Sequence, residues 1–557
     1  MNILGISGFE NSMPFKRAHW PSLDEREYRI SQGHDAAAAL VIDGEVVAAA
    51  AEERFNREKH SSRFPLRAIE YCISQADLAL EKIDELAHGF DYGPFEQLFS
   101  LDPVASQLYR EVYSRDALLR LTERDLGGFP ADRVHHVGHH LAHGASAYFT
   151  SGFDECLVVV IDGMGEVVSA TVYRGNAGRL EKLHEISAAH SIGILYSLVT
   201  LHLGFNFGAD EYKIMGLAPY GDPQRFQAFF EQAIDLRPNG SIRVPPLALN
   251  QTREERENHL GTRRYLAEHL GSPRTPDDPI TDAHRDVAAA LQEGLDRAME
   301  HLCGHFAAQT GLRRLAMAGG VALNCTSNGK LLRSGLFDDI YIQPAAGDDG
   351  SALGAALFRA SLQDGVLPNR RFPVPFLGPA PSRNAIESAI SEVGNRIEVE
   401  RFDGLELACQ RAAELIRDGH VLAWYRGADG VRPTRVRTSQ HPGRSRTPGD
   451  ARSNQLDGQD ARSLSALRSC GHHRASASLV RGSADDRTAV HDHHRGCPGR
   501  TSCSAAGGDA HQRVGPGTDG QQERQRVVSH IARRGRPDHG SRDGSQHKLQ
   551  RQGTTDR

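Results

Sequence analysis

Two stretches of the sequence share one pattern, and this repetition limits the possible folds more than any other feature. Residues 33–55 read GHDAAAALVIDGEVVAAAAEERF and residues 156–174 read CLVVVIDGMGEVVSATVYR, so each contains two apolar runs joined by Asp-Gly. Apolar runs around Asp-Gly predict β-hairpins with their turns at 43–44 and 162–163. Helical patterns follow both copies. We therefore expect a duplicated α/β domain whose ligands bind in a central cleft, at strand ends and helix N-termini.

The remaining elements follow from apolar periodicity and glycine-rich turns. The segment DEYKIMGLAPYG, 210–221, is interpreted as a loop and turn, and the polar region 235–280 has no diagnostic pattern. Helices are expected over 65–78, 139–150, 191–205 and 284–310, a strand, Gly-Gly turn and helix over 312–335, and a strand, acidic glycine loop and helix over 340–360.

Charge divides the chain into two unequal parts. The chain has a formal net charge of −6, but from residue 428 onward it holds 22 Arg and one Lys against 13 acidic residues. The first 427 residues therefore carry about −16, which argues against nucleic acid as their main partner. No apolar run reaches the length of about 18 residues that a membrane span needs, and no signal-peptide pattern is present. With eight scattered cysteines and no CxxC pair, we expect a reduced, cytoplasmic protein.

The segment HHLAH at 139–143 is a candidate metal-binding motif. His139 and His143 would lie one helical turn apart, so both imidazoles could bind one ion. Neutral imidazole suits iron, zinc or manganese. The alternative is a polar helix face, although the flanking GASAYF is small and apolar and indicates burial.

Two aspartates could complete such a site. Asp162 ends the apolar run LVVVID, and Asp348 lies in the loop AAGDDGSALG. A carboxylate at the end of a buried strand faces the cleft, where it could bind a metal or hold a water molecule. The alternatives are an ordinary turn aspartate for Asp162 and a helix cap for Asp348.

Other motifs suggest phosphate binding and proton transfer. Gly319 and Gly320 follow a strand and precede a helix, where backbone N–H groups can hold a phosphate. His34, in GHD, could accept a proton from a hydroxyl. Lys213 could contact a phosphate or be an ordinary surface lysine. The basic residues after the first hairpin could bind phosphate or form a solvated charged face, and they are Arg54, Arg57, Lys59 and His60.

Together these residues resemble one family. The segments GHDAAAALVIDGEVVAAAAEERFNREKH, HHLAHGASAYFTSGF, VVVIDGMGE, YKIMGLAPYG, AGGVALNCTSNGK and QPAAGDDGSALGAA stand in the order typical of the NodU/CmcH carbamoyltransferases. The resemblance covers about residues 1–427. It implies a duplicated actin-like ATPase domain, similar to Kae1/TsaD, over 1–360. The start of a YrdC-like α/β domain that forms carbamoyl-adenylate would occupy 361–427.

The resemblance also implies a reaction. Carbamoyl phosphate and ATP, with Mg²⁺, would give a carbamoyl-adenylate, and the first domain would transfer the carbamoyl group to a hydroxyl of a sugar-containing acceptor. His34, with Asp35 beside it, would be the catalytic group. The resemblance further implies that a metal, expected to be Fe²⁺ or another divalent ion, binds at His139, His143, Asp162 and Asp348. It also implies nucleotide or phosphate contacts at Gly319, Gly320, Asn324, Lys213, Arg54 and Lys59.

The last 130 residues differ from the rest of the chain. Residues 428–557 contain no Phe, Tyr or Trp, whereas the first 427 hold all 36 aromatic residues. Such a segment buries too little apolar surface to offset its ordering entropy, so we expect it to be disordered.

A shifted reading frame accounts for this composition. Read one base out of frame, GADGVRPTRVRTSQHPGRS permits RMEFGPRALGRRSILADP, and QHKLQRQG permits NTSFNVKG. DARSNQLDGQDARSLSALRSCG likewise permits MRDRINSMVKMREAFRPFAP. All three products are patterns of the same family, in the right order. We therefore interpret 428–557 as an out-of-frame translation, with a natural basic tail as the alternative.

Several functions stay open at this level. The preferred acceptor is a lipo-chitooligosaccharide nodulation factor, and antibiotic or polysaccharide tailoring is the alternative. A tRNA threonylcarbamoyl-transfer partner is a different class, against which the acidic first part weighs. An inactive truncated scaffold is the non-enzymatic reading. The sequence predicts small-molecule partners and leaves the metal and the oligomeric state undetermined.

Overall fold

The computed structural model describes residues 1–363, 371, 376–420, 422 and 428. These residues fall into two units, of which the first contains the described residues up to Ala380 and the second contains 381–420. The predicted tail, 428–557, lies outside the described residues except for Ala428.

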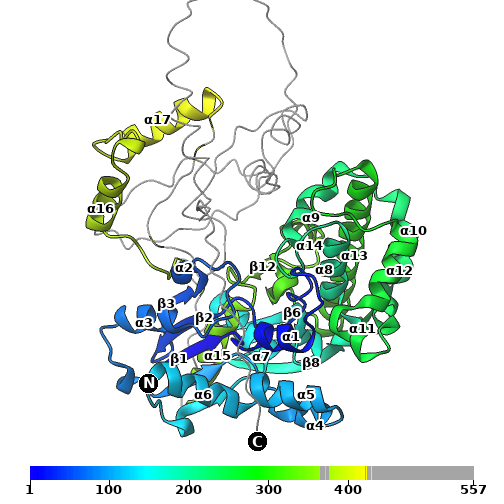
Figure 1. Cartoon of the computed structure of the whole chain (residues 1–557), viewed down its shortest axis with the longest axis horizontal. Helices are drawn as coiled ribbons and strands as arrows, with labels where there is room; N and C mark the ends of the chain where they lie inside the picture. Colours follow the sequence, from blue (N-terminus) through cyan, green and yellow to red (C-terminus); the bar gives the residue numbers. More distant parts are fainter. Residues whose placement is uncertain (364–370, 372–375, 421, 423–427, 429–557) are drawn as a thin grey trace, which may run out of the picture. The chain divides into compact units, whose positions relative to one another are not determined.

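Two five-stranded sheets of identical topology lie in the first unit. Figure 1 shows β1, β2 and β3 of one sheet and β6, β8 and β12 of the other. The first has the order β3-β2-β1-β4-β5, and the second has the order β8-β7-β6-β11-β12. In both, three strands are antiparallel and the last two run parallel to the central strand. The expected duplicated α/β architecture is therefore confirmed. The strands are β1 (Asn2–Ser7), β2 (Ala37–Ile42), β3 (Glu45–Ala51), β4 (Glu85–His88), β5 (Val134–His136), β6 (Glu155–Gly165), β7 (Val168–Asn176), β8 (Arg179–Ser187), β11 (Arg314–Ala318) and β12 (Asp339–Ile342), with β9 (Asp235–Leu236) and β10 (Ile242–Arg243) as a separate pair.

The first predicted hairpin is confirmed and the second has a different turn. Asp43 and Gly44 join β2 to β3 with φ of 49° and 81°, the left-handed values of a tight hairpin turn. Asp162 and Gly163 are not a turn, which corrects the sequence prediction. The β6–β7 pairing shifts register after Ile161, so β6 continues to Gly165 and the chain turns at 166–167. Asp162 and Gly163 therefore lie in the part of β6 that is not regularly paired with β7.

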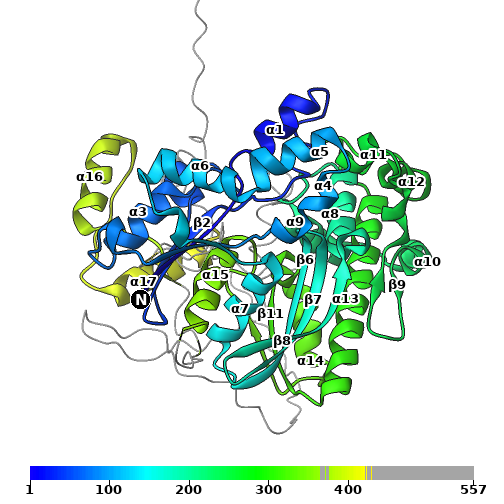
Figure 2. The same ribbon diagram turned by 90° about the horizontal axis from the view of Figure 1, so that it is seen from below.

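Two helices separate the sheets, α7 (His139–Ser151) and α15 (Asp349–Ser361) (Figure 2). One apolar core joins residues of both helices to residues of both sheets. Small residues permit the close approach: a Cβ at Gly354 would overlap the carbonyl of Ala142, and a Cβ at Gly5 would overlap that of Ala352. These helices therefore hold the two halves at a fixed separation.

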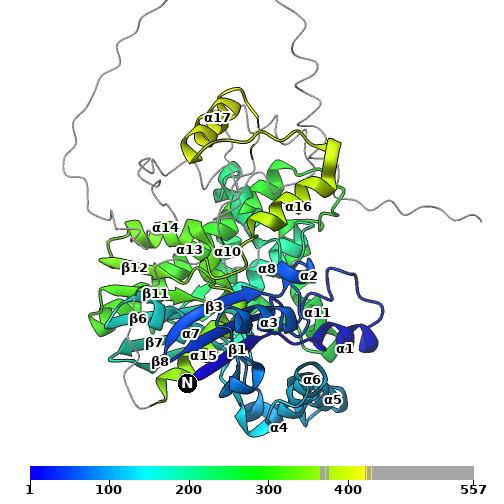
Figure 3. The ribbon, with the colours of Figure 1, turned by 90° about the vertical axis from the view of Figure 1, so that its left-hand side faces the viewer.

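Other helices cover the outer faces. The helix α3 (Leu66–Ser74) packs on β2 and β3, while α8 (Ile192–His202) and α13 (Asp282–Thr310) contact β6. Figure 3 shows α4, α5 and α6 grouped at one edge of the unit. The remaining helices are α1 (Ser12–His19), α2 (Glu53–Asn56), α4 (Glu96–Phe99), α5 (Pro103–Leu108), α6 (Arg115–Leu126), α9 (Glu211–Leu217), α10 (Gln224–Ala233), α11 (Arg253–Asn258), α12 (Leu260–Leu270) and α14 (Cys325–Arg333).

The segment 210–221 corrects a second expectation, because residues 211–217 form α9 rather than a loop. Ile214 and Leu217 are buried in the core of the second half, so tertiary packing overrides the glycine and proline signals. The second unit contains α16 (Arg383–Val393) and α17 (Leu405–Arg417). Among the described residues, no helix is both long and apolar enough to cross a membrane.

Candidate active site

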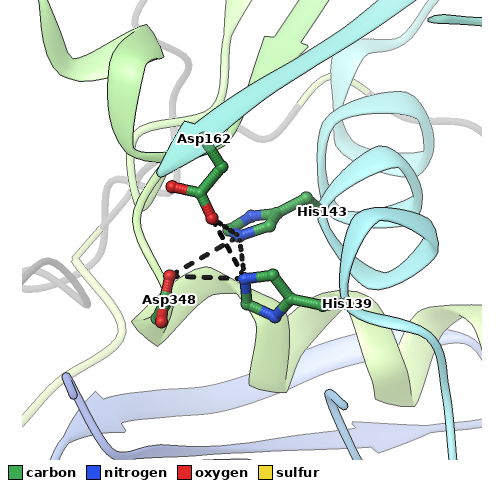
Figure 4. Close-up of side chains that lie close together, drawn as sticks. All are labelled: His139, His143, Asp162 and Asp348. Carbon is green, nitrogen blue, oxygen red and sulfur yellow. Dashed lines mark hydrogen bonds and ion pairs between the residues drawn. The ribbon is translucent and has the colours of Figure 1, made fainter. Parts of the chain in front are cut away.

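Four side chains from three elements meet between the two sheets (Figure 4). Helix α7 supplies His139 and His143, β6 supplies Asp162, and the loop before α15 supplies Asp348. One ligand atom of each lies within 4.8 Å of the others. The two histidine Nε2 atoms are 3.0 Å apart. The sequence-predicted set is thus brought together, including residues that are 209 positions apart in the chain.

The carboxylates face the imidazoles at similar distances. From Nε2 of His139 to Asp162 Oδ2 is 3.2 Å, and to Asp348 Oδ1 is 3.4 Å. The corresponding distances from His143 are 3.7 and 3.8 Å. Two ligands bonded to one metal at about 2.1 Å stand about 3.0 Å apart at right angles and about 3.4 Å apart in a tetrahedron. The cluster has nearly the size of a coordination shell.

Burial excludes the alternative interpretations from the sequence. His139 and His143 are fully buried, so they do not form a solvated polar helix face. Asp162 is buried within a strand rather than in a turn. Asp348 precedes α15, but its side chain makes no capping hydrogen bond. All four polar side chains therefore point at one another.

Electrostatics couples the members of the cluster. Burial alone would lower the pKa of His139, but Asp348 and Asp162 outweigh it and raise that pKa well above its usual value. Burial would raise the pKa of Asp162, yet the neighbouring histidines lower it. The pKa of Asp348 is lowered against burial in the same way. Two ionised carboxylates in a buried site thus require positive charge beside them.

Backbone groups fix the orientation of these ligands. The Nδ1 atom of His139 lies 2.9 Å from the carbonyl of Gly89, which leaves Nε2 for the cluster. The ring of Phe90 stacks on His139 at 3.9 Å between centroids. Asp162 accepts hydrogen bonds through Oδ1 from the N–H groups of Gly163 and Gly320, at 2.8 and 3.0 Å, so its Oδ2 faces the histidines.

Of the predicted nucleotide residues, Gly319 and Gly320 lie beside this centre. Gly320 contacts Asp162 as described, and the Gly319 N–H donates to the carbonyl of Ala346 at 2.8 Å. The N–H groups of Gly319 and Gly320, which were predicted to bind a phosphate, therefore already have acceptors within the protein. Asn324 caps α14 and donates to Gln292 at 3.0 Å.

His34 and Asp35 lie at the start of the first hairpin, with different partners. His34 Nε2 is 3.1 Å from the Ser31 hydroxyl and 3.3 Å from the Arg29 carbonyl. Its Nδ1 is buried and has no hydrogen-bond partner among the described residues. Burial lowers the pKa of His34 to about 4. Asp35 Oδ1 instead lies 2.7 Å from Nδ1 of His60.

Two of the predicted phosphate-binding residues lie near the same tyrosine ring. Lys59 Nζ lies 5.7 Å from the ring centre of Tyr212, and Lys213 Nζ lies 5.9 Å from the same centre. Lys213 also pairs with Asp210 at 3.1 Å. Lys213 is on α9 and not before a glycine turn as expected. Arg54 lies on α2, five residues before Lys59.

Sequence reasoning assigned no role to Glu166. Its carboxylate accepts the N–H of His139 at 3.0 Å, and burial raises its pKa to about 7. The motif DGMGE contains it, but an acidic residue after glycine is an ordinary loop signal.

The comparisons with known proteins give a consistent assignment. The family described as Carbamoyltransferase N-terminus matches residues 29–98 and 104–357. Nodulation protein NolNO of Sinorhizobium fredii is 38% identical over 78% of this chain and 60% of its own length. An uncharacterised protein of Synechocystis is 34% identical over 71% and 67%. Nodulation protein NolO of Bradyrhizobium diazoefficiens is 38% identical over 53% and 51%.

The chain spans 51–67% of the length of these three relatives. Among solved structures, the activator of the 2-hydroxyisocaproyl-CoA dehydratase from Clostridium difficile matches 72% of this chain at 15% identity, with a TM-score of 0.33 that carries no weight beside the sequence match. A family match of this extent, in the half of the chain that builds the cluster, places the chain in the carbamoyltransferase family through its N-terminal region.

Proposed function

We propose that this chain is an O-carbamoyltransferase that uses the four-residue cluster as its transfer site. Carbamoyl phosphate, activated with ATP as a carbamoyl-adenylate, would donate the carbamoyl group to a hydroxyl of a sugar-containing acceptor. The observation that carries the proposal is the convergence of His139, His143, Asp162 and Asp348 inside the family-matched region. Two of the relatives are named as nodulation proteins, and for this reason we propose a lipo-chitooligosaccharide nodulation factor as the acceptor.

The cluster suits a divalent metal, and we propose Fe²⁺. Two imidazoles and two carboxylates are a donor set that such ions accept, and the cluster has nearly the size of a coordination shell, with the distances from His143 somewhat long. The buried carboxylates need a positive neighbour, which a bound cation would supply while leaving both imidazoles neutral. When bound, a divalent metal supplies Lewis acidity toward a carbonyl or phosphoryl oxygen.

The surrounding residues would bind the donor. We assign Gly319, Gly320 and Asn324 to the nucleotide part, because the hydrogen bond from Gly320 to Asp162 connects this loop to the cluster. Since the N–H groups of Gly319 and Gly320 already have protein acceptors, the nucleotide would contact other atoms of the loop. Lys59 and Lys213, which both lie near the ring of Tyr212, would bind phosphate oxygens, with Arg54 as a further cation. AMP leaves with a negative charge on its phosphate group, so cations there would favour its departure.

His34 would take the proton from the acceptor hydroxyl. The Arg29 carbonyl can only accept a hydrogen bond, so Nε2 of the neutral ring carries the proton and Nδ1 keeps its lone pair. The lowered pKa keeps this ring unprotonated at neutral pH. The hydroxyl oxygen then attacks the carbamoyl carbon, and the mixed-anhydride C–O bond breaks with its electron pair on a phosphate oxygen of the departing AMP. Asp35 would hold this loop through His60.

The test separates metal binding from transfer. The full chain is reconstituted anaerobically with Fe²⁺, and bound metal is measured beside transfer of labelled carbamoyl groups to chitooligosaccharides. One reaction receives carbamoyl phosphate with ATP and Mg²⁺, and another receives preformed carbamoyl-adenylate. Transfer in the second reaction alone would mean that the first part works and donor formation does not.

Matched histidine variants make the result specific. We expect His139→Ala to lose most of the bound metal and the transfer, whereas His269→Ala, an exposed histidine on α12, keeps both. Unchanged metal content and transfer in His139→Ala would refute the site. A wild-type protein that transfers from neither donor to any sugar would refute the function.

A further inference from the structure

Glu166 occupies an unusual position at the tip of the β6–β7 hairpin. It is 7% exposed, and its φ of 51° is in the left-handed region that few residues other than glycine adopt. Its carboxylate accepts the N–H of His139, with Oε1 at 3.0 Å and Oε2 at 3.3 Å, and the N–H of Asp91 at 2.8 Å. A charged side chain held in this conformation by buried contacts indicates a constrained role.

Helix α7 depends on this carboxylate for its N-terminal cap. Gly138, which precedes the helix, has no side chain to cap it. The free N–H groups of a first helical turn need acceptors, and a negative charge there interacts favourably with the helix dipole. Glu166 supplies both from a different element. The helix that carries His139 and His143 therefore begins at a point that the hairpin sets.

The same hairpin also carries a ligand. Asp162 lies four residues before Glu166 on β6, so one element holds Asp162 and fixes the start of the helix with the histidines. Gly165 allows the contact, because a Cβ there would overlap the ring of His139. Glu166 also holds a third segment, through the N–H of Asp91. The two residues before Asp91 orient His139, because the Gly89 carbonyl lies next to its Nδ1 and the ring of Phe90 stacks on it.

We propose that Glu166 is a positioning residue that sets the distance between Asp162 and the two histidines and thereby determines the metal affinity of the cluster. It joins the three segments that surround His139, and its carboxylate is hydrogen-bonded to the backbone N–H groups of His139 and Asp91. The metal part of this inference rests on the proposed function. The structural part, namely the hydrogen bonds from the N–H groups of His139 and Asp91 to Glu166, does not depend on the proposed function.

The variants are Glu166→Gln, which keeps one acceptor oxygen, and Glu166→Ala, which keeps none. Glu185→Gln is the matched control, because Glu185 is an exposed glutamate on the adjacent strand β8. The full chain is titrated with Co²⁺ against a competing chelator, and the visible spectrum is recorded. Loss of an outer-shell partner weakens metal binding by about 10- to 100-fold. We expect such a weakening in Glu166→Ala, with an altered Co²⁺ spectrum, a smaller weakening in Glu166→Gln and none in Glu185→Gln.

Hydrogen exchange of the metal-free chain tests the structural part independently. In Glu166→Ala, peptides that contain the His139 and Asp91 amides should exchange faster, by about tenfold for the loss of a cap. The acceleration should be smaller in Glu166→Gln, which keeps one acceptor oxygen, and the control should match the wild type. Wild-type exchange in these peptides, or wild-type Co²⁺ affinity and spectrum in Glu166→Ala, overturns the proposal. A wild-type chain that binds no Co²⁺ refutes the metal site, and exchange alone then decides whether Glu166 positions His139.

Discussion

The buried histidine His88 offers a sharp test of how burial controls stability in this fold. It ends β4 at 1% exposure, with Nε2 3.0 Å from the Gly8 carbonyl and Nδ1 3.4 Å from that of Phe90. Burial lowers its pKa to about 3, against the two carbonyls that favour the charged ring. The unfolded chain, with a histidine pKa of about 6.5, therefore binds a proton between these values and the folded chain does not.

This difference in bound protons determines how the stability of the folded chain changes with pH. The contribution of His88 to stability is complete above about pH 6.5 and decreases as the pH falls, because protons then bind the unfolded chain preferentially. At pH 5 the loss is 1.5 units times 1.36 kcal/mol, or about 2 kcal/mol. We compare His88→Gln, which keeps an N–H donor for Gly8 and does not titrate. A replacement of this kind costs about 1 kcal/mol at neutral pH.

The order of stability of the wild type and His88→Gln should therefore reverse between neutral and acidic pH. At pH 7.5 we expect the variant to be less stable by about 1 kcal/mol, and at pH 5 more stable by about the same amount. Urea unfolding followed by far-ultraviolet circular dichroism at both pH values measures the difference. His269→Gln on the surface of α12 is the control and should keep the wild-type pH dependence. An equal difference between His88→Gln and wild type at both pH values would refute the reasoning.

Three further predictions concern packing, proton transfer and the reading frame. Gly354→Ala should lower stability by about 3 kcal/mol or prevent folding, because its Cβ overlaps the carbonyl of Ala142; a wild-type melting temperature would contradict this. If His34, with its pKa lowered to about 4, is the base, transfer at saturating donor should stay constant down to about pH 5 and fall below it, and His34→Gln should lose about 100-fold in kcat; an acid limb near 6.5 would point to another group. Sequencing the gene across the codons for 424–437 should reveal an inserted or deleted base relative to the frame read here, and confirmation of that frame would reject the out-of-frame interpretation of 428–557.

Many elements could be predicted from the local sequence pattern, because their conformation depends mainly on residues that are neighbours in the chain. Apolar runs predicted the strands of the two hairpins, and Asp-Gly at 43–44 predicted a turn that the structure contains. No pattern predicted β4, β5 or β8. The helical period placed His139 and His143 on one face before any packing was known. The choice of Asp162 and Asp348 as partners was only one of two readings for each residue.

Where prediction failed, contacts remote in the sequence decided the outcome. The second Asp-Gly, at 162–163, is as good a turn signal as the first, but pairing with β7 carries the strand past it to Gly165. Residues 211–217 contain glycine next to a proline-bearing turn, yet burial of Ile214 and Leu217 makes them helical. Propensity is a weak preference that tertiary packing overrides.

The sequence by itself determined the duplicated α/β plan, the histidine pair and the family, since each rests on residue order or on a local period. Only the tertiary structure decided that Asp162 and Asp348 face those histidines, because strand register and helix packing bring together positions 209 residues apart. It also revealed Glu166 as the cap of α7. A carboxylate that acts through the backbone of another element leaves no periodic signal in its own segment, so its role exists only in the folded chain.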